Sequence, residues 1–177
     1  LYDETAFADL TQNEDVDVIV WGVRGYSNAS RNPHMFGWID EKKGNISKIS
    51  VKKPLGNPTE DPIILGTFTF VRPADFRACV DRLITRNGRI DGEFYIDSCL
   101  NDAIEMGLRC RLFEVDSYLC WGTPNDLRTF EYWQSCFHKW GAHPYRLEND
   151  ARVSTKQIAP LETKFTTVRP EFPVLRK

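Results

Sequence analysis

Runs of β-branched and aromatic residues along the chain predict a set of strands. Residues 16–23, Val-Asp-Val-Ile-Val-Trp-Gly-Val, form a dense apolar run that is typical of a buried strand. Residues 35–40 and 46–51 flank a Lys-Gly-Asn turn, and the second run alternates apolar and polar positions as a half-buried strand does. Residues 63–71 form a further apolar run, which Gly66 interrupts. The pattern therefore predicts a strand, a hairpin and another strand in this order.

Apolar residues at helical spacing follow these strands. A helix is predicted from Pro73 to Asn87, and a second one within residues 92–106. Residues 109–115 again favour a strand. The stretch Thr123-Pro124-Asn125-Asp126 then supplies a helix cap, a proline at the first helical position and a capping-box acid. Interleaved strands and helices predict a mixed α/β fold.

The chain of 177 residues is long enough for one domain with a sizeable core. We expect residues 1–141 to form that domain. Prolines punctuate the polar residues 142–177, which we expect to form an extended C-terminal arm or a linker. The first residues lack an initiator Met and the basic and apolar regions of a signal peptide, so we expect the sequence to begin inside a longer protein.

The bulk composition argues against several classes of function. Hydrophobic residues make up 41% of the chain and charged residues 27%, as in an ordinary globular domain. A net charge of −2 and a pI near 6.0 predict no nucleic-acid or membrane-surface partner. No apolar run approaches the roughly 18 residues of a membrane helix. Five cysteines without a CxxC pair indicate reduced thiols rather than a zinc site, so we expect a cytoplasmic protein.

Three segments carry the candidate chemistry. They are Phe36-Gly37-Trp38-Ile39-Asp40 to Lys52-Lys53-Pro54, then Ile64-Leu65-Gly66-Thr67-Phe68-Thr69-Phe70, and then Gly92-Glu93-Phe94-Tyr95-Ile96-Asp97 to Trp121-Gly122-Thr123-Pro124-Asn125-Asp126-Leu127. Together they resemble the sugar-1-phosphate nucleotidyltransferases, the NDP-sugar pyrophosphorylase family, over about Val16 to Trp140. Their order and spacing carry the resemblance.

This resemblance implies an α/β fold with a Rossmann-like mixed sheet and flanking helices, related to the GT-A glycosyltransferases. It implies that an NTP and a sugar 1-phosphate give an NDP-sugar and pyrophosphate, with Mg²⁺ in the complete enzyme, for capsule, lipopolysaccharide or other glycan biosynthesis. The family's Gly-rich nucleotide loop and first metal-binding Asp are missing from this sequence. The chain is therefore expected to be the C-terminal, sugar-phosphate side, inactive without the N-terminal nucleotide-binding part.

The resemblance also implies which residues face the sugar phosphate. Gly37 would let the backbone approach the sugar, because a Cβ would collide there. Lys53 matches the Lys of the family's E-K-P element and would pair with the phosphate, the alternative being a solvated loop lysine. Gly66 and Thr67 match the strand that lines the sugar pocket, the alternative being a plain strand glycine or bulge.

Two carboxylates complete the expected site. Glu93 and Asp97 could accept hydrogen bonds from sugar hydroxyls, and one of the two is expected to be only a helix N-terminal acid that the helix dipole favours. Asn101 follows one turn later and is expected to be an exposed helix residue.

Two positions depart from the family's pattern. The Glu of E-K-P is Lys52 here, and a cation cannot accept hydrogen bonds from hydroxyls. Either the substrate preference shifts toward an acidic or phosphorylated sugar, or Lys52 points outward. The family's metal-holding Asp is Cys120 here, and a thiol is a poor ligand for Mg²⁺. Asp116 could hold the metal instead, the missing part could supply the ligands, or the site is degenerate.

Two further functions stay open beside the enzyme. A non-catalytic or regulatory module of the same fold would bind the sugar phosphate or a partner subunit, in keeping with Lys52 and Cys120. A GT-A glycosyltransferase domain would need a D-x-D metal motif, and Asp15-Val16-Asp17 has this spacing but lies at the start of a strand. The sequence leaves a homo-oligomer open.

Overall fold

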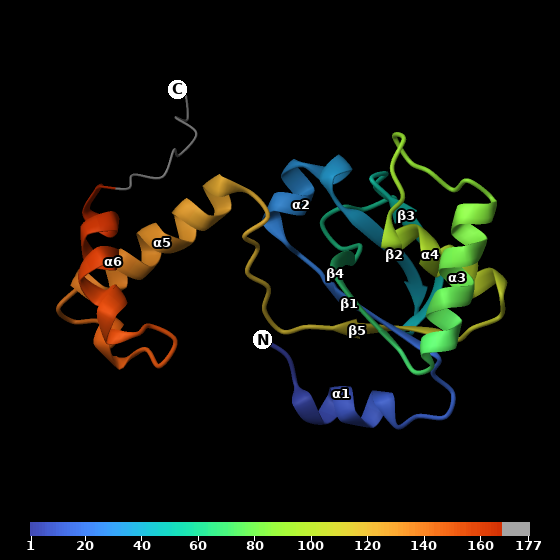
Figure 1. The fold of residues 1–177 in the computed structure, drawn as a ribbon, viewed down its shortest axis with the longest axis horizontal. Helices are drawn as coiled ribbons and strands as arrows, with labels where there is room; N and C mark the ends of the chain where they lie inside the picture. The colour runs from blue at the N-terminus through green and yellow to red at the C-terminus, as the bar shows by residue number, and fades with distance from the viewer. Residues whose placement is uncertain (168–177) are drawn as a thin grey trace. The chain divides into compact units, whose positions relative to one another are not determined.

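The computed structural model describes residues 1–167, with side chains through residue 163. The chain divides into two compact units, Leu1–Tyr118 and a second unit that begins at Leu119 (Figure 1). The division lies earlier than the boundary expected after residue 141. The reason is that helix α5 (Pro124–Lys139) packs against the later helix α6 (Thr155–Thr167) and so belongs to the second unit.

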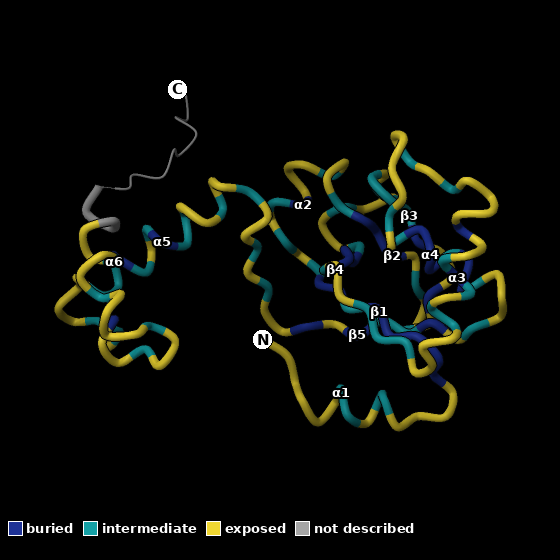
Figure 2. Tube along the Cα trace, in the orientation of Figure 1, coloured by how far each residue is buried: buried dark blue, intermediate teal, exposed yellow. Residues whose placement is uncertain are grey.

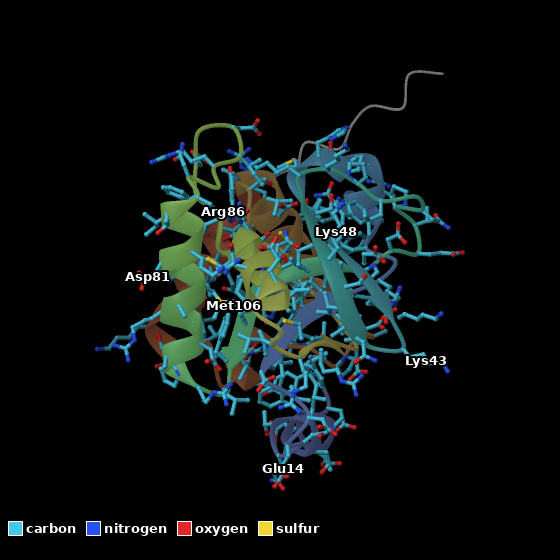
Figure 3. All side chains as sticks on the ribbon, turned by 90° about the vertical axis from the view of Figure 1, so that its right-hand side faces the viewer. Glu14, Lys43, Lys48, Asp81, Arg86 and Met106 are labelled. Atoms are coloured by element: carbon cyan, nitrogen blue, oxygen red, sulfur yellow. The ribbon has the colours of Figure 1, made fainter. Side chains whose placement is uncertain are left out.

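The first unit is built around five strands. They are β1 (Val18–Val23), β2 (Gly37–Lys42), β3 (Asn45–Val51), β4 (Ile63–Phe70) and β5 (Cys110–Glu114). Each falls where the apolar runs predict a strand. The turn between β2 and β3 consists of Lys43 and Gly44, both at positive φ (53° and 79°), as a two-residue hairpin turn requires. Lys43 marks the tip of this hairpin in Figure 3.

The sheet closes on itself in the order β1-β4-β2-β3-β5. β1 and β5 are parallel, and the other pairs are antiparallel. Two junctions of the ring contain a single register pair each, Trp38 with Ile63 and Asn45 with Arg111. The mixed α/β class is confirmed. The closed sheet differs from the open sheet of a Rossmann-like fold because the β2–β3 hairpin joins β4 on one side and β5 on the other.

Helices flank this sheet. They are α1 (Glu4–Thr11), the short α2 (Ser27–Arg31), α3 (Pro73–Thr85) and α4 (Ile96–Glu105), with a single 3₁₀ turn η1 (Pro33–Met35). α4 packs on β3, and α3 packs on α4 (Figure 3). Pro73 opens α3 and Gly107, at φ 79°, follows α4, as the sequence predicts.

The core lies on both faces of the strands. Val18 and Val20 of β1 join a cluster under α3 and α4, whereas Ile19 joins a second cluster with Trp38 and Phe113. This alternation follows the two-residue period of a strand. Both sides of β1 are therefore buried, in agreement with its dense apolar sequence, and Figure 2 shows burial concentrated in the strands and α4.

The second unit is helical. Thr123 caps α5 as predicted, because its hydroxyl accepts from the Asp126 amide at 3.2 Å and the Asp126 carboxylate accepts from the Thr123 amide at 3.1 Å. A 3₁₀ turn, η2 (Leu147–Asn149), and α6 occupy part of the stretch expected to be an extended arm. α6 carries Pro160 within it, which hid the helix from the sequence pattern. Residues 168–177 of the expected arm lie outside the described residues.

Candidate functional site

The start of β2 lies directly against the first turn of α4. Gly37 is buried, and a Cβ built on it would lie 2.5 Å from Asp97 Oδ2 and 3.2 Å from Ile64 Cδ1. Only glycine therefore lets the Asp97 carboxyl rest on the backbone of β2. Two residues that the sequence assigned to one site are neighbours in space.

The carboxyl of Asp97 is half-buried. Burial raises its pKa above the usual value, and no cationic side chain in the described part of the chain offsets this effect. The N-terminal end of α4 favours negative charge nearby and acts in the opposite direction. Such a carboxyl is suited to hydrogen bonding with a neutral polar group, for example a hydroxyl, rather than to pairing with a cation.

Lys52 connects the end of β3 to the start of α4. Its Nζ donates to the Tyr95 hydroxyl and lies 4.5 Å from the centre of the Tyr95 ring. The same hydroxyl donates to Glu93 Oε2 at 2.5 Å. The hydrogen bond to Tyr95, with the negative charge of Glu93, raises the pKa of the Lys52 amine. The alternative that Lys52 simply points outward is therefore wrong.

The backbone of Lys52 explains this direction. Its φ is 55°, which is uncommon for a residue with a side chain. Its amide donates to the Phe36 carbonyl at 3.0 Å, next to Gly37. Lys53, the predicted phosphate ligand, has an exposed side chain, and its carbonyl accepts from Ser50 Oγ at 2.6 Å. The Lys52 amine thus reaches Tyr95, which directly precedes α4. The role of Lys53 as a phosphate ligand stays a prediction.

A bulge in β4 brings Gly66 and Thr67 to the same end of the sheet. β1 advances from Val20 to Gly22 while β4 runs from Phe68 back to Ile64, so residues 65–67 leave the ladder. Gly66 has φ 76°, which favours glycine. The bulge is thus the alternative foreseen for Gly66, and bulges often redirect side chains beside functional sites.

An open hollow of about 480 Å³ lies beside this bulge; we call it the apolar hollow. It is lined by Gly66, Thr67, Phe68, Phe70, Pro73, Phe76 and Ile96. Ile96 directly precedes Asp97, and Ile64, two residues before Gly66, touches the space beside Gly37. The hollow and the Gly37–Asp97 contact are thus formed by nearby residues of the same two elements, β4 and α4.

The two residues considered for a metal site, Asp116 and Cys120, belong to different units of the chain. Asp116 is exposed at the end of the first unit, and Cys120 lies in the second, where its sulfur accepts from the Gly122 amide at 3.3 Å. Within residues 1–167, no group of three or more His, Cys, Asp or Glu side chains is arranged to hold a metal ion. Mg²⁺ commonly uses one or two carboxylates together with phosphate oxygens, and Asp116 offers one such carboxylate.

The carboxylates of the D-x-D stretch are engaged with a cation. Arg109 donates to Asp15 Oδ1 at 2.8 Å and to Asp17 Oδ2 at 2.9 Å, from both its side chain and its backbone. These hydrogen bonds lower the pKa of Asp17 to about 2. Asp15 and Asp17 therefore form a structural ion-pair cluster, which leaves a glycosyltransferase metal motif without support.

Sequence reasoning missed two residues near the site. Asn101 was expected to be exposed, but it is half-buried, and its amide bonds the backbone N–H and carbonyl of Ile49, each at 2.9 Å. This pair occupies the edge of β3 where β5 has diverged from it. The sequence analysis did not single out Tyr95. The one related signal was Lys52, which stands where the family has Glu and donates to the Tyr95 hydroxyl.

Comparison with known proteins gives a fold and no closer relationship. No protein-family model matches the chain, and no curated protein matches it. Among solved structures, the nucleoside-diphosphate-sugar pyrophosphorylase from Vibrio cholerae RC9 is similar, with a TM-score of 0.55 and 15% identity over 73% of this chain. The match covers 49% of that protein, so this chain spans about half of its length. A mixed α/β fold with a sheet and flanking helices is what the two share.

One further observation concerns membranes. Within residues 1–167, no helix has both the length and the apolar character that crossing a bilayer requires.

Proposed function

We propose that this chain is the sugar-phosphate side of a nucleotidyltransferase that couples an NTP to a sugar 1-phosphate and releases pyrophosphate. The observation that carries the proposal is the convergence of the start of β2, the end of β3, the bulge of β4 and the start of α4. These segments bring together Gly37, Asp97, the Lys52–Tyr95–Glu93 chain and the Gly66–Thr67 wall of the apolar hollow. The shared fold with a nucleoside-diphosphate-sugar pyrophosphorylase supports it.

Each of these groups has a definite chemical task in the proposal. The carboxyl oxygens of Asp97 and Glu93 accept hydrogen bonds from ring hydroxyls, and Gly37 leaves the space in which the Asp97 carboxyl is held. Lys52 and Lys53 supply positive charge for the phosphate. Fixing the sugar phosphate in line with the nucleotide is the main contribution such a site makes to phosphoryl transfer.

The nucleotide-binding part and the metal belong to the complete enzyme in this proposal. Mg²⁺, when bound, would neutralise charge on the reacting phosphates, and Asp116 is the carboxylate of this chain that would contribute to holding it. The finer assignment, a relative of the GT-A glycosyltransferases that acts in the cytoplasm in glycan assembly for capsule or lipopolysaccharide, is part of the same proposal.

Binding of glucose 1-phosphate to the chain, followed by calorimetry, tests the proposal. We expect binding that Asp97→Asn weakens about tenfold, because a group making a hydrogen bond in a site contributes about 1.4 kcal/mol when lost. Asp81→Asn is the matched control, since Asp81 lies on the outer side of α3 (Figure 3). Equal binding by both variants, or no binding of any hexose or amino-sugar 1-phosphate by the wild type, would refute the proposal.

A non-catalytic module with the same binding site is the second candidate. The replacement of the family's metal-binding Asp by Cys120 favours it. Pyrophosphate release by the full-length protein, measured across sugar phosphates and NTPs, separates the two. Turnover supports the enzyme, and sugar-phosphate binding without turnover under any pairing supports the module.

A further inference from the structure

Helix α5 packs in the second unit through a polar face. Glu131 and Ser135, one turn apart, are buried, and the side chain of His138 is only 11% exposed. The imidazole of His138 accepts from the Leu147 amide at 3.2 Å through Nδ1, and its Nε2 lies 3.0 Å from Glu162 Oε1. These partners belong to η2 and α6. Helices usually turn an apolar face toward the core, so the packing of α5 is reversed.

Aromatic side chains occupy the opposite side of α5 and continue to the residue that ends it. We call them the aromatic stripe; its members are Phe130, Trp133, Phe137 and Trp140. They recur at spacings of three, four and three residues, which is the spacing of a seam between two helices. The rings of Trp133 and Phe137 stack with their centres 6.0 Å apart. Trp133 is 48% exposed and Trp140 is 58% exposed.

The exposed area of the aromatic stripe matches what a small interface requires. With about 250 Å² of surface per tryptophan, Trp133 and Trp140 together expose about 265 Å² in one chain and about 530 Å² in two chains. A specific interface buries at least about 1,000 Å² in total, of which about 570 Å² is apolar. Two facing stripes therefore supply nearly all of this apolar area from the tryptophans alone, and the phenylalanines add to it.

The aromatic stripe is also self-complementary. Its spacing reads the same in both directions, so two antiparallel copies of α5 place each aromatic residue opposite another. Phe130 then lies opposite the partner's Trp140, and Trp133 lies opposite the partner's Phe137. A two-fold symmetric dimer requires such a surface. The antiparallel direction also brings the positive end of each helix dipole near the negative end of the other.

The first unit offers no comparable partner surface in its described residues. Its exposed large apolar side chains come one or two to an element, for example Met35 in η1, Ile84 in α3 and Ile96 in α4. None of these elements carries a row of rings that would match the aromatic stripe.

We infer that α5 pairs, antiparallel and with two-fold symmetry, with α5 of a second copy of this chain through the aromatic stripe. This dimer would be the homo-oligomer that the sequence leaves open, and it does not depend on the proposed sugar-phosphate site. Tryptophans near the centre of an interface often contribute most of the binding energy. Trp133 lies nearer the two-fold axis than Trp140, so its side chain is the main contributor.

Sedimentation equilibrium of the whole chain measures the dissociation constant of the dimer, which we expect in the micromolar range of small interfaces. Trp133→Gln should raise this constant at least about 30-fold, the loss typical of a central tryptophan. Ile84→Gln is the control, because it removes a side chain that is 55% exposed on α3 and should change the constant by less than about twofold. Circular dichroism checks that both variants remain folded.

Cys136 reports how the two helices are arranged. It lies beside the aromatic stripe, directly before Phe137, and the two-fold axis of the antiparallel pair passes close to it. Cys120 and Cys136 are the two cysteines that are not buried. A short bis-maleimide should therefore join two chains of Cys120→Ser through Cys136, and it should not join chains that also carry Cys136→Ser.

Four results would overturn the inference. They are a wild-type chain that stays monomeric up to about 1 mM, a dimer that Trp133→Gln does not weaken, equal weakening by Trp133→Gln and Ile84→Gln, and a dimer that Cys136 does not cross-link. Sugar phosphates take no part in this experiment, so its failure leaves the proposed function intact.

Discussion

Replacing Gly37 by alanine tests the central contact of the candidate site. The new Cβ would lie 2.5 Å from Asp97 Oδ2, so that oxygen must retreat to the 3.4 Å at which ordinary contact begins. Ile64 Cδ1, at 3.2 Å, blocks part of the space on the other side. Overpacking of this kind typically costs about 1–3 kcal/mol, and we expect Gly37→Ala to lower the free energy of unfolding by about 2 kcal/mol.

The measurement is urea unfolding of the variants, followed by circular dichroism. Gly56→Ala is the matched control, because no atom lies within 4 Å of a Cβ built on that exposed glycine and its backbone needs no positive φ. We expect the control to be neutral or slightly stabilising. Since the severe clash, at 2.5 Å, is with the Asp97 side chain, Asp97→Ala should restore most of the stability lost in Gly37→Ala.

The double variant makes the reasoning refutable. A coupling energy between positions 37 and 97 of about 1 kcal/mol or more is expected. Additive effects, with coupling below about 0.5 kcal/mol, would show that the Asp97 carboxyl does not rest on Gly37, and the candidate site would lose its central contact.

Two further predictions concern ion pairs, and a third concerns the Lys52 amine. Asp17 has a folded pKa of about 2, below its unfolded value of 3.8, so its contribution of about 2 kcal/mol is present above pH 4 and lost as the pH falls through 2; urea unfolding of Asp17→Asn at several pH values should show a flatter profile over this range. Arg86→Met leaves the fully buried Asp102 carboxylate without its bidentate partner and should cost about 3–5 kcal/mol in the same unfolding assay, whereas no loss would mean that Arg82, 3.8 Å from the same carboxylate, compensates for Arg86. Lys52→Met should weaken sugar 1-phosphate binding about tenfold in calorimetry, while the exposed Lys48→Met should not; equal affinities would remove Lys52 from the site.

Local patterns predicted the elements of the first unit because their signals are local. The β-branched run of β1, the Lys43-Gly44 turn and the proline that opens α3 each act on their own neighbours in sequence. The closure of the sheet depends on two distant register pairs, Trp38 with Ile63 and Asn45 with Arg111, for which no short motif exists. Topology was therefore the part of the fold that the sequence left open.

The candidate site divides in the same way. Gly37 and Asp97 were named from motif position, and their contact supports the grouping. The direction of the Lys52 side chain depends on its backbone φ of 55°. Positive φ is uncommon for residues other than glycine, so the sequence does not predict it at a lysine. Asn101 was misjudged because its partner, the backbone edge of β3, is created by tertiary structure. Polar residues that satisfy such edges look like surface residues in sequence.

Two single-pair junctions divide the ring of strands into two more extensively paired pieces, the β2–β3 hairpin and the β1–β4–β5 group. The junction at Trp38 and Ile63 adjoins Gly37, so a ligand that touches both β2 and β4 would fasten the pieces at their weakest line. Amide hydrogen exchange would slow along this line on binding, ahead of any change in the deeper strands. Ligand binding and the stability of the junction between β2 and β4 would then be thermodynamically linked.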